Sequence, residues 1–258
     1  MTPNHTFVTM ITGASSGIGA EFARLTASHY THSALVLIAR REKKLHLLAT
    51  ELRQLGASVL VLPLDVSHKT DCLQAVDKTL AQFGHIDRFI GNAGYSDAIF
   101  ARDFSFERFH KVMDCNLNGV LHFLPPLLAH FQARRSGHLV AVSSLAAFLT
   151  VPGSSAYHCS KAALMGVMHS LRRDLRNSPI CTTVICPGFI KSDLTAKNRF
   201  PMPFLMELKP ACQRMFKKIN QKKAFYAFPK PLYYLTKLLS FLPLWLQDLC
   251  LRRDYDKI

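Results

Sequence analysis

The chain has 258 residues, 49% of them hydrophobic and 19% charged, and no Gly/Ser-rich, Pro-rich or repetitive tract interrupts it. These values exclude a disordered or linker-joined architecture and favour one α/β domain, or two small ones, with a sizeable core. The net charge of +15 lies mostly after Lys191, where 14 Lys and Arg stand against 5 Asp and Glu, but no nucleic-acid-binding motif accompanies it, so we expect no nucleic-acid partner.

Apolar, β-branched runs and helical stretches alternate along the chain up to Ile185. The expected strands are 7–11, 34–38, 59–64, 88–90, 139–142 and 182–185, and the expected helices are 20–30, 42–55, 69–83, 106–132 and 156–176. Continuously apolar strands separated by helices predict a parallel sheet that is covered on both faces. The order of the units predicts a Rossmann-type, doubly wound α/β fold of three layers, helix, sheet and helix.

The alternation stops beyond Pro187 and Gly188. Residues 191–223 show no clean period and predict a loop-helix excursion, and the segment from Ala224 onward fits a last strand followed by an apolar helical stretch, 232–251. Lys237, Pro243 and Asp248 interrupt that stretch. We therefore expect a buried or interfacial helix there rather than a membrane span.

Cysteine and histidine usage limits the chemistry that the chain can carry. The seven cysteines show no C-x-x-C spacing and the twelve histidines no H-E-x-x-H spacing, so we expect reduced thiols and no metal site. His158 and Cys159 are interpreted as rim and packing residues. The N-terminus lacks the basic region and cleavage site of a signal peptide, which predicts a cytoplasmic location.

A glycine-rich turn follows the first expected strand and reads T-G-A-S-S-G-I-G, from Thr12 to Gly19. Glycines at 13, 17 and 19 allow positive φ angles and close backbone approach, and the following helix offers unpaired N–H groups to an anion. The turn predicts a site for the pyrophosphate of a dinucleotide. The alternative is a tight turn that only packs the helix against the strand.

The second expected strand ends in Ala39-Arg40-Arg41, where NAD-specific enzymes usually place a carboxylate on the adenosine ribose. Two guanidinium groups at this place would pair with a 2′-phosphate. The sequence therefore favours NADP(H) over NAD(H). The alternative is a solvated, basic helix start that also includes Lys43 and Lys44.

Tyr157 and Lys161 are four residues apart in an expected helix, so they project from the same face. An ammonium beside a phenol favours the phenolate and should lower the pKa of the tyrosine, which suits a proton-transfer group. Ser144 ends the apolar strand L-V-A-V-S-S at the carboxyl edge, where ligands of open α/β sheets bind. Its hydroxyl could hold a carbonyl oxygen, and its neighbour Ser143 is a rival for that position.

From about residue 6 to 193 the chain resembles the short-chain dehydrogenase/reductase family, whose motifs occur here in the family's order. The matching positions are Thr12 to Gly19, Asp65-Val66, Asn92-Ala93-Gly94, Asn116, Ser144, Tyr157, Lys161 and Pro187-Gly188. Gly91 replaces an asparagine of many relatives, and a glycine-rich closing strand common among tetrameric relatives is missing, which leaves a homodimer or a homotetramer open.

The resemblance implies hydride transfer between a nicotinamide and a carbonyl or alcohol. Tyr157 would be the general acid and base, Lys161 would bind the nicotinamide ribose and lower the tyrosine pKa, and Ser144 would orient the substrate oxygen. Asn116 would maintain a helix distortion and a water that leads to the lysine. The expected cofactor contacts are Gly13, Ser15, Ser16, Gly17, Ile18, Gly19, Arg40, Arg41, Asp65, Val66, Asn92, Ala93, Gly94, Tyr157, Lys161, Pro187, Gly188, Ile190 and Ser192.

The resulting prediction is an NADP(H)-dependent oxidoreductase with a core at 1–190 and, in the same domain, a substrate lid and apolar appendage at 191–258. Apolar residues at 201–206 suggest a hydrophobic ketone, aldehyde or lipid-like substrate, and the alternative is a lid that packs only against its own body. The basic cluster before residues 232–251 suggests peripheral membrane contact, although a dimer contact explains the same pattern. The alternative is a nucleotide-binding redox sensor or scaffold without turnover. A nucleotide-sugar epimerase is disfavoured, because it would need a larger C-terminal domain.

Overall fold

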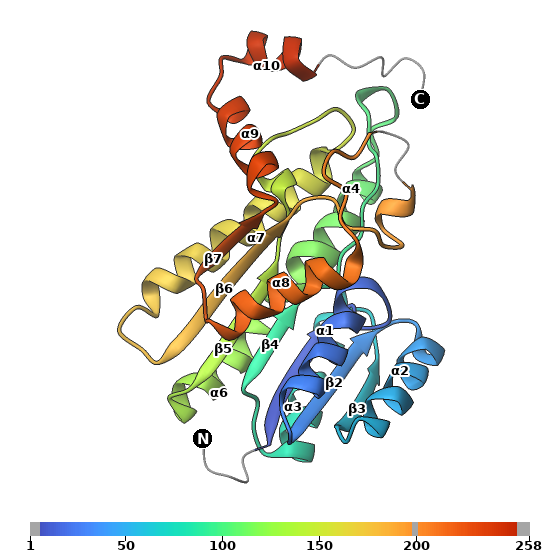
Figure 1. Ribbon diagram of the computed structural model, residues 1–258, viewed down its shortest axis with the longest axis vertical. Coiled ribbons are helices and arrows are strands. Elements are labelled where there is room, and N and C mark those ends of the chain that lie inside the picture. The colour runs from blue at the N-terminus through green and yellow to red at the C-terminus, as the bar shows by residue number, and fades with distance from the viewer. Residues whose placement is uncertain (1–5, 198–200, 252–258) are drawn as a thin grey trace.

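The computed structural model describes residues 6–197 and 201–251 and contains a seven-stranded, fully parallel sheet in the order β3-β2-β1-β4-β5-β6-β7 (Figure 1). The strands are β1 Phe7–Thr12, β2 Ser33–Ala39, β3 Ser58–Pro63, β4 Arg88–Gly91, β5 Gly137–Val142, β6 Ile180–Pro187 and β7 Phe225–Phe228. Each expected strand is present, including the last one. The parallel register, such as Thr9 opposite Leu35 in β2 and Arg88 in β4, confirms the predicted doubly wound fold.

Helices cover both faces of this sheet (Figure 1). They are α1 Gly17–His29, α2 Glu42–Gln54, α3 Lys69–Phe83, α4 Phe106–Met113, α5 Gly119–Leu121, α6 Leu124–Arg134, α7 Ser155–Asp174, α8 Leu208–Asn220, α9 Lys230–Ser240 and α10 Leu244–Leu251. One hydrophobic core unites α3, α6 and α7 with one face, and a second unites α1, α2 and α8 with the other. Successive β1 residues serve both cores, since Met10 belongs to the first and Ile11 to the second.

The expected continuous helix 106–132 is wrong, because the chain forms α4, a π-helical turn at Asp114–Asn118, α5 and α6 in succession. Asn116 lies in this π-turn, and its side chain forms hydrogen bonds with the backbone of Tyr95. A Cβ on Gly119 would lie 2.5 Å from Val66, so a glycine allows the close approach of this segment to the loop after β3. Two prolines in the first turn of α6 lack the N–H of a continuous helix.

Helices α9 and α10, residues 230–251, extend beyond the carboxyl end of the sheet and are called the C-terminal arm below (Figure 1). The base of α9 packs on the sheet, because Leu232 is buried and belongs to the first core. In α10 no residue is buried. Among the described residues, no helix has both the length and the apolar character needed to cross a membrane.

Candidate active site

The predicted site residues gather at the carboxyl edge of β1, β4, β5 and β6. The two central strands of this edge are joined by hydrogen bonds from the N-A-G segment to the end of β1. Thr12 Oγ1 accepts from the backbone N of Asn92 at 2.9 Å and of Ala93 at 3.0 Å, and Asn92 Nδ2 donates to the carbonyl of Thr12 at 3.0 Å. This place lies between β1 and β4, where the strand order reverses, which is the usual ligand site of a doubly wound sheet.

The glycine turn has the shape that a pyrophosphate requires. Gly13 and Gly17 have φ angles of 67° and 54°, which side chains other than glycine rarely adopt. A Cβ on Gly19 would lie 2.4 Å from the carbonyl oxygen of Gly13. Helix α1 begins here with no acidic residue in its first turn and no side-chain cap on its N–H groups. The residues present therefore fit a dinucleotide phosphate.

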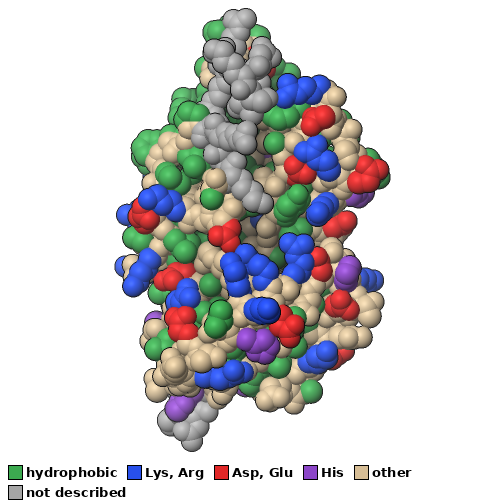
Figure 2. All heavy atoms as spheres, turned by 90° about the vertical axis from the view of Figure 1, so that its right-hand side faces the viewer, with side chains coloured by type: hydrophobic (Ala, Val, Ile, Leu, Met, Phe, Trp, Pro, Cys, Tyr) green, Lys and Arg blue, Asp and Glu red, His purple; other side chains and the backbone are tan. Residues whose placement is uncertain are grey.

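Arg40 and Arg41 lie at the end of β2 and take different partners. Arg40 pairs with Asp65 at 3.3 Å and is 65% exposed. Arg41 donates to Ser15 at 3.0 Å and to Ser16, and it pairs with Asp193 at 3.0 Å. On the side of the molecule where α2 and α4 lie, Figure 2 shows Lys and Arg side chains gathered across the middle. The guanidinium of Arg41 thus lies against the glycine turn rather than only in solvent.

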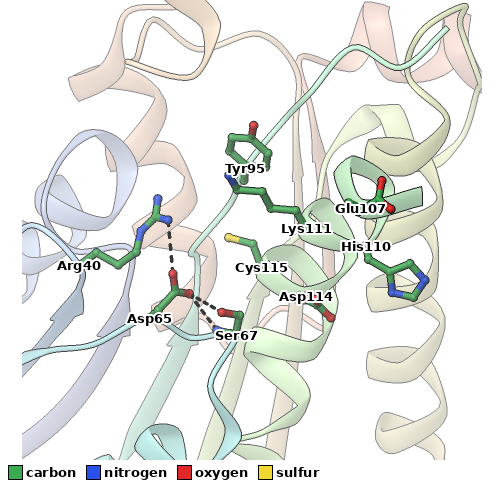
Figure 3. Close-up of a pocket in the computed structure, with 9 residues that line it drawn as sticks. All are labelled: Arg40, Asp65, Ser67, Tyr95, Glu107, His110, Lys111, Asp114 and Cys115. Atoms are coloured by element: carbon green, nitrogen blue, oxygen red, sulfur yellow. Dashed lines mark hydrogen bonds and ion pairs between the residues drawn. The ribbon is translucent and has the colours of Figure 1, made fainter. Parts of the chain in front are cut away.

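Next to these arginines is a pocket of about 230 Å³. Its lining residues are Arg40, Asp65, Ser67, Tyr95, Glu107, His110, Lys111, Asp114 and Cys115 (Figure 3). Burial would raise the pKa of Asp65, but two hydrogen bonds from Ser67 and the charge of Arg40 outweigh it and hold the pKa below its usual value. Asp65 is therefore ionised at neutral pH, on the side where the resemblance places the adenine.

Asn116 joins the π-turn to the helix that carries Tyr157. Its Oδ1 accepts from the backbone N of Tyr95 at 2.7 Å, and its Nδ2 donates to the Tyr95 carbonyl and to Ser160 Oγ, each at 2.9 Å. Ser160 in turn donates to the carbonyl of Tyr157 at 2.8 Å. The buried Asn116 therefore fixes the helix start around Tyr157 through hydrogen bonds.

Ser144, Tyr157 and Lys161 lie together between β5 and α7. The Ser144 hydroxyl lies near the Tyr157 phenol and lowers its pKa, and it accepts from the backbone N of Ala146 at 3.1 Å. Lys161 Nζ donates to the carbonyl of Val142 at 2.9 Å and lies 5.8 Å from the centre of the Tyr157 ring. The end of β5 thus holds both the Ser144 hydroxyl and the Lys161 ammonium near the phenol.

The pKa values of this pair differ from the sequence-based expectation. Burial raises the pKa of Tyr157, and the hydrogen bond from Ser144 lowers it only in part. Burial also lowers the pKa of Lys161 to about 8. The expected lowering of the tyrosine pKa by Lys161 is therefore not found, because the cost of a buried phenolate exceeds what the neighbouring groups supply.

Ser143 and His158 support the site from outside it. Ser143 Oγ donates to the Lys161 carbonyl at 2.9 Å, so its hydroxyl points to α7 while that of Ser144 points to Tyr157. His158 Nδ1 donates to the Ala146 carbonyl at 2.7 Å. This bond ties α7 to the turn after Ser144, a positioning contact that the sequence analysis missed.

The segment after β6 closes the site on the remaining side. The backbone N of Gly188 donates to Phe228 at 2.7 Å, and Ile190 forms a bridge with Met206. A Cβ on Gly17 would lie 3.6 Å from that of Ser192, so Ser192 faces the glycine turn. Pro187 ends β6.

The structure therefore brings the glycine turn, the N-A-G segment, Ser144, Tyr157, Lys161 and Ser192 to one edge, with Arg40 and Arg41 at its rim. The contacts of Asp193, Ser160 and His158 were not predicted from the sequence. Ser160 could have been found, since it follows Tyr157 by three residues on the same helix. No sequence signal connects Asp193 with Arg41, which lies 152 residues earlier. The described residues contain no group of three His, Cys, Asp or Glu suited to a metal ion.

The family model for short chain dehydrogenases matches residues 7–202. The chain belongs to the short-chain dehydrogenase/reductase family. It is accordingly an oxidoreductase that acts on the CH–OH/C=O pair and binds a nicotinamide cofactor.

Individual relatives agree with this membership. An uncharacterized oxidoreductase of Myxococcus xanthus is 38% identical, with 95% of this chain and 96% of the relative covered. The 11-beta-hydroxysteroid dehydrogenase-like 2 protein of Arabidopsis thaliana is 31% identical, with 92% and 78% covered. A short-chain dehydrogenase/reductase of Burkholderia phymatum, solved with NAD, has a TM-score of 0.84 at 23% identity and 98% coverage of both chains. This last likeness shows the fold alone.

Proposed function

We propose that the protein is an NADP(H)-dependent carbonyl reductase for an apolar ketone, aldehyde or lipid-like substrate, with Tyr157 as its proton donor. The contact between the Ser144 hydroxyl and the Tyr157 phenol carries this proposal. A carbonyl oxygen that accepts from both hydroxyls would be polarised and within reach of the phenolic proton. A nicotinamide dinucleotide held at the glycine turn would supply the hydride for the carbonyl carbon.

The raised pKa of Tyr157 favours the direction of reduction. At neutral pH the phenol keeps its proton, which is the form that a carbonyl oxygen needs when it becomes an alcohol. Lys161 holds its ammonium on the Val142 carbonyl, from where it would bind ribose hydroxyls. Ser143 and Asn116 act through the backbone of α7, so they are positioning residues rather than proton carriers.

The preference for NADP(H) is supported by Arg40 and Arg41. Each guanidinium pairs with one carboxylate, Asp65 or Asp193, and stays partly exposed. Arg41 is also oriented by Ser15 and Ser16 beside the glycine turn. A 2′-phosphate at the end of β2 would accept charge-assisted hydrogen bonds from both. The apolar substrate is supported by Phe148 and Phe189, which pack next to the end of β5 and β6, and by the hydroxysteroid dehydrogenase relative.

The proton-donor role is tested with Tyr157→Phe in NADPH-dependent reduction of a panel of apolar ketones and aldehydes. The loss of a general acid should lower kcat by about 10²- to 10⁴-fold, while NADPH binding, followed by its fluorescence, stays unchanged. Tyr234→Phe, an exposed tyrosine on α9, is the matched control. Turnover retained by Tyr157→Phe would reject the role of Tyr157 as proton donor. If the wild-type protein itself binds NADPH but shows no turnover, the non-enzymatic sensor would be favoured.

The cofactor preference is tested with the double variant Arg40→Ala, Arg41→Ala. Its affinity for NADPH should fall by about tenfold or more, and its affinity for NADH should change little. The double variant Lys43→Ala, Lys44→Ala removes the same charge from the exposed start of α2 and should leave both affinities unchanged. Equal losses in the two double variants would mean that the arginines are only part of a solvated basic surface.

The quaternary state and location stay predictions. The resemblance favours a homodimer or homotetramer, and the cytoplasm stays the expected location. Sedimentation of the purified protein measures the first, and cell fractionation measures the second.

A further inference from the structure

The C-terminal arm carries a large share of the exposed apolar side chains among the described residues. Seven of the fourteen exposed large hydrophobic residues among the described ones lie in this arm. They are Tyr234, Leu235, Leu238, Phe241, Leu244, Trp245 and Leu249. Figure 2 shows hydrophobic side chains along the upper part of the molecule, where the arm lies. An apolar surface of this kind marks a binding surface.

The protein body covers only the base of the arm. Leu232 packs within 3.1 Å of a Cβ built on Gly188, and Tyr233 meets Phe148 edge to face with ring centres 5.5 Å apart. Beyond this base, Phe241 is 78% exposed and Trp245 is 68% exposed. Helix α10 is apolar except for Gln247 and Asp248 and has no buried residue, so its apolar side chains lack a cover from the described residues.

The charge of the arm indicates what covers it. The arm itself has two lysines, Lys230 and Lys237, and one acidic residue, Asp248, and residues 208–229 before it add six Lys and Arg and no acidic residue. Lys237 Nζ lies 5.5 Å from the ring centres of Phe148 and Phe241, and Lys230 Nζ lies over three tyrosine rings. Aromatic and leucine side chains next to lysines are typical of helices that lie in an anionic membrane interface.

A second copy of the chain fits this surface less well. Two identical surfaces would bring like charges together, which costs free energy in an interface. An anionic lipid surface neutralises the same lysines and accepts the apolar side chains. Helix α10 has 8 residues and a length of about 12 Å, so it would lie along the interface of a bilayer rather than across it.

We propose that the C-terminal arm docks the protein on an anionic membrane surface, with α10 and the outer part of α9 among the lipid headgroups. Phe148, three residues after the Ser144 turn begins, contacts both Tyr233 and Lys237 of the arm. The substrate side of the site therefore lies next to the docked surface. That apolar substrates enter from the lipid rests on the proposed function, whereas the docking itself does not.

The chain contains one tryptophan, Trp245, and it lies in the middle of the exposed arm. Its fluorescence therefore reports docking without a label. With vesicles of phosphatidylglycerol and phosphatidylcholine, the emission should shift to shorter wavelength, brominated lipid should quench it, and the protein should float with the vesicles. Pure phosphatidylcholine should give little of these three effects, and high salt should weaken all of them.

Two double variants carry equal added charge and separate the arm from the rest of the surface. Leu238→Glu with Leu249→Glu should lower the vesicle partition coefficient by about tenfold or more. Leu47→Glu with Leu55→Glu changes two exposed leucines at α2 and should leave it unchanged. Thermal unfolding by circular dichroism checks that both variants fold, and neither measurement uses substrate, so failure of the proposed enzyme activity would not affect them.

Three results would overturn the docking proposal. One is an unshifted Trp245 spectrum with anionic vesicles, and another is an equal loss of binding in both double variants. The third is a combination of two observations: the wild-type protein binds no vesicles, and it sediments as a dimer that the double variant Leu238→Glu, Leu249→Glu dissociates. The arm would then be the contact between two copies.

Discussion

Helices α1 and α10 are both apolar, yet seven residues of α1 are buried and none of α10 is. The difference lies in their partners. Helix α1 packs between the sheet and α8 as part of the second core, whereas α10 stands beyond the sheet edge. Apolar residues that pack in the two cores thus stabilise the fold, and the exposed apolar residues of the arm contribute little to its stability. Mutations in the two regions should therefore differ in what they change.

The largest difference is expected at Asp87, which immediately precedes β4. Its carboxylate accepts from the backbone N of Val8 and from Arg134, each at 2.8 Å, and is buried. Asp87→Ala leaves both donors without this partner and should lower the free energy of unfolding by about 3–5 kcal/mol. Asp248→Ala on the exposed α10 should change it by less than about 0.5 kcal/mol. Chemical denaturation measures both, and equal values would contradict the comparison.

A smaller effect is expected from overpacking at Gly137, the first residue of β5. A Cβ there would lie 2.1 Å from the ring of Phe131, which is fully buried. Gly137→Ala should therefore cost about 1–3 kcal/mol. Gly166 on α7 has open space around it, so Gly166→Ala should instead stabilise the helix by about 0.5–1 kcal/mol. A stabilising Gly137→Ala would show that the first core is loosely packed.

The pH dependence of the site tests the burial of Lys161. Because its pKa is lowered to about 8, the ammonium is present below that pH and is lost above it. The kcat/KM for NADPH, which reports the free enzyme, should fall by about tenfold per pH unit above about pH 8. The neighbouring Cys186 has a pKa of about 12 and cannot cause this limb. A profile that stays flat to higher pH would mean that Lys161 keeps its charge.

The smallest effect is expected in the arm itself. Leu249 is exposed, so Leu249→Ala should change the free energy of unfolding by less than about 0.5 kcal/mol. Leu127 of α6 is fully buried, and Leu127→Ala should cost about 2–5 kcal/mol. A destabilisation by Leu249→Ala close to that of Leu127→Ala, measured in dilute protein without lipid, would show that the arm belongs to the core after all.

The sequence predicted the sheet well because most strands are runs of apolar and β-branched residues, which is the pattern of a parallel strand covered on both faces. It did not predict the break in 106–132. That break depends on the side chain of Asn116 reaching Tyr95, and the approach of Gly119 to Val66 requires the tertiary structure. Periodicity alone reports none of these contacts.

The candidate site shows the same division. The glycine turn, Ser144, Tyr157 and Lys161 could be identified because their spacing and their place at strand ends are local properties. The pKa of Tyr157 could not, since its direction depends on burial by the whole fold and not on the lysine one turn away. The contact of Asp193 with Arg41 joins distant segments and likewise follows only from the folded chain.

Strand β7 has a consequence for the way this protein is made. It is the outer neighbour of β6, and their pairing from Val184 to Pro187 uses residues 225–228. During synthesis the edge of β6 remains open until these late residues leave the ribosome. An open, apolar edge is a template for pairing with other chains, so shortened products that end before Phe225 should aggregate in cells even though every residue of the glycine turn and the Tyr157 helix is present.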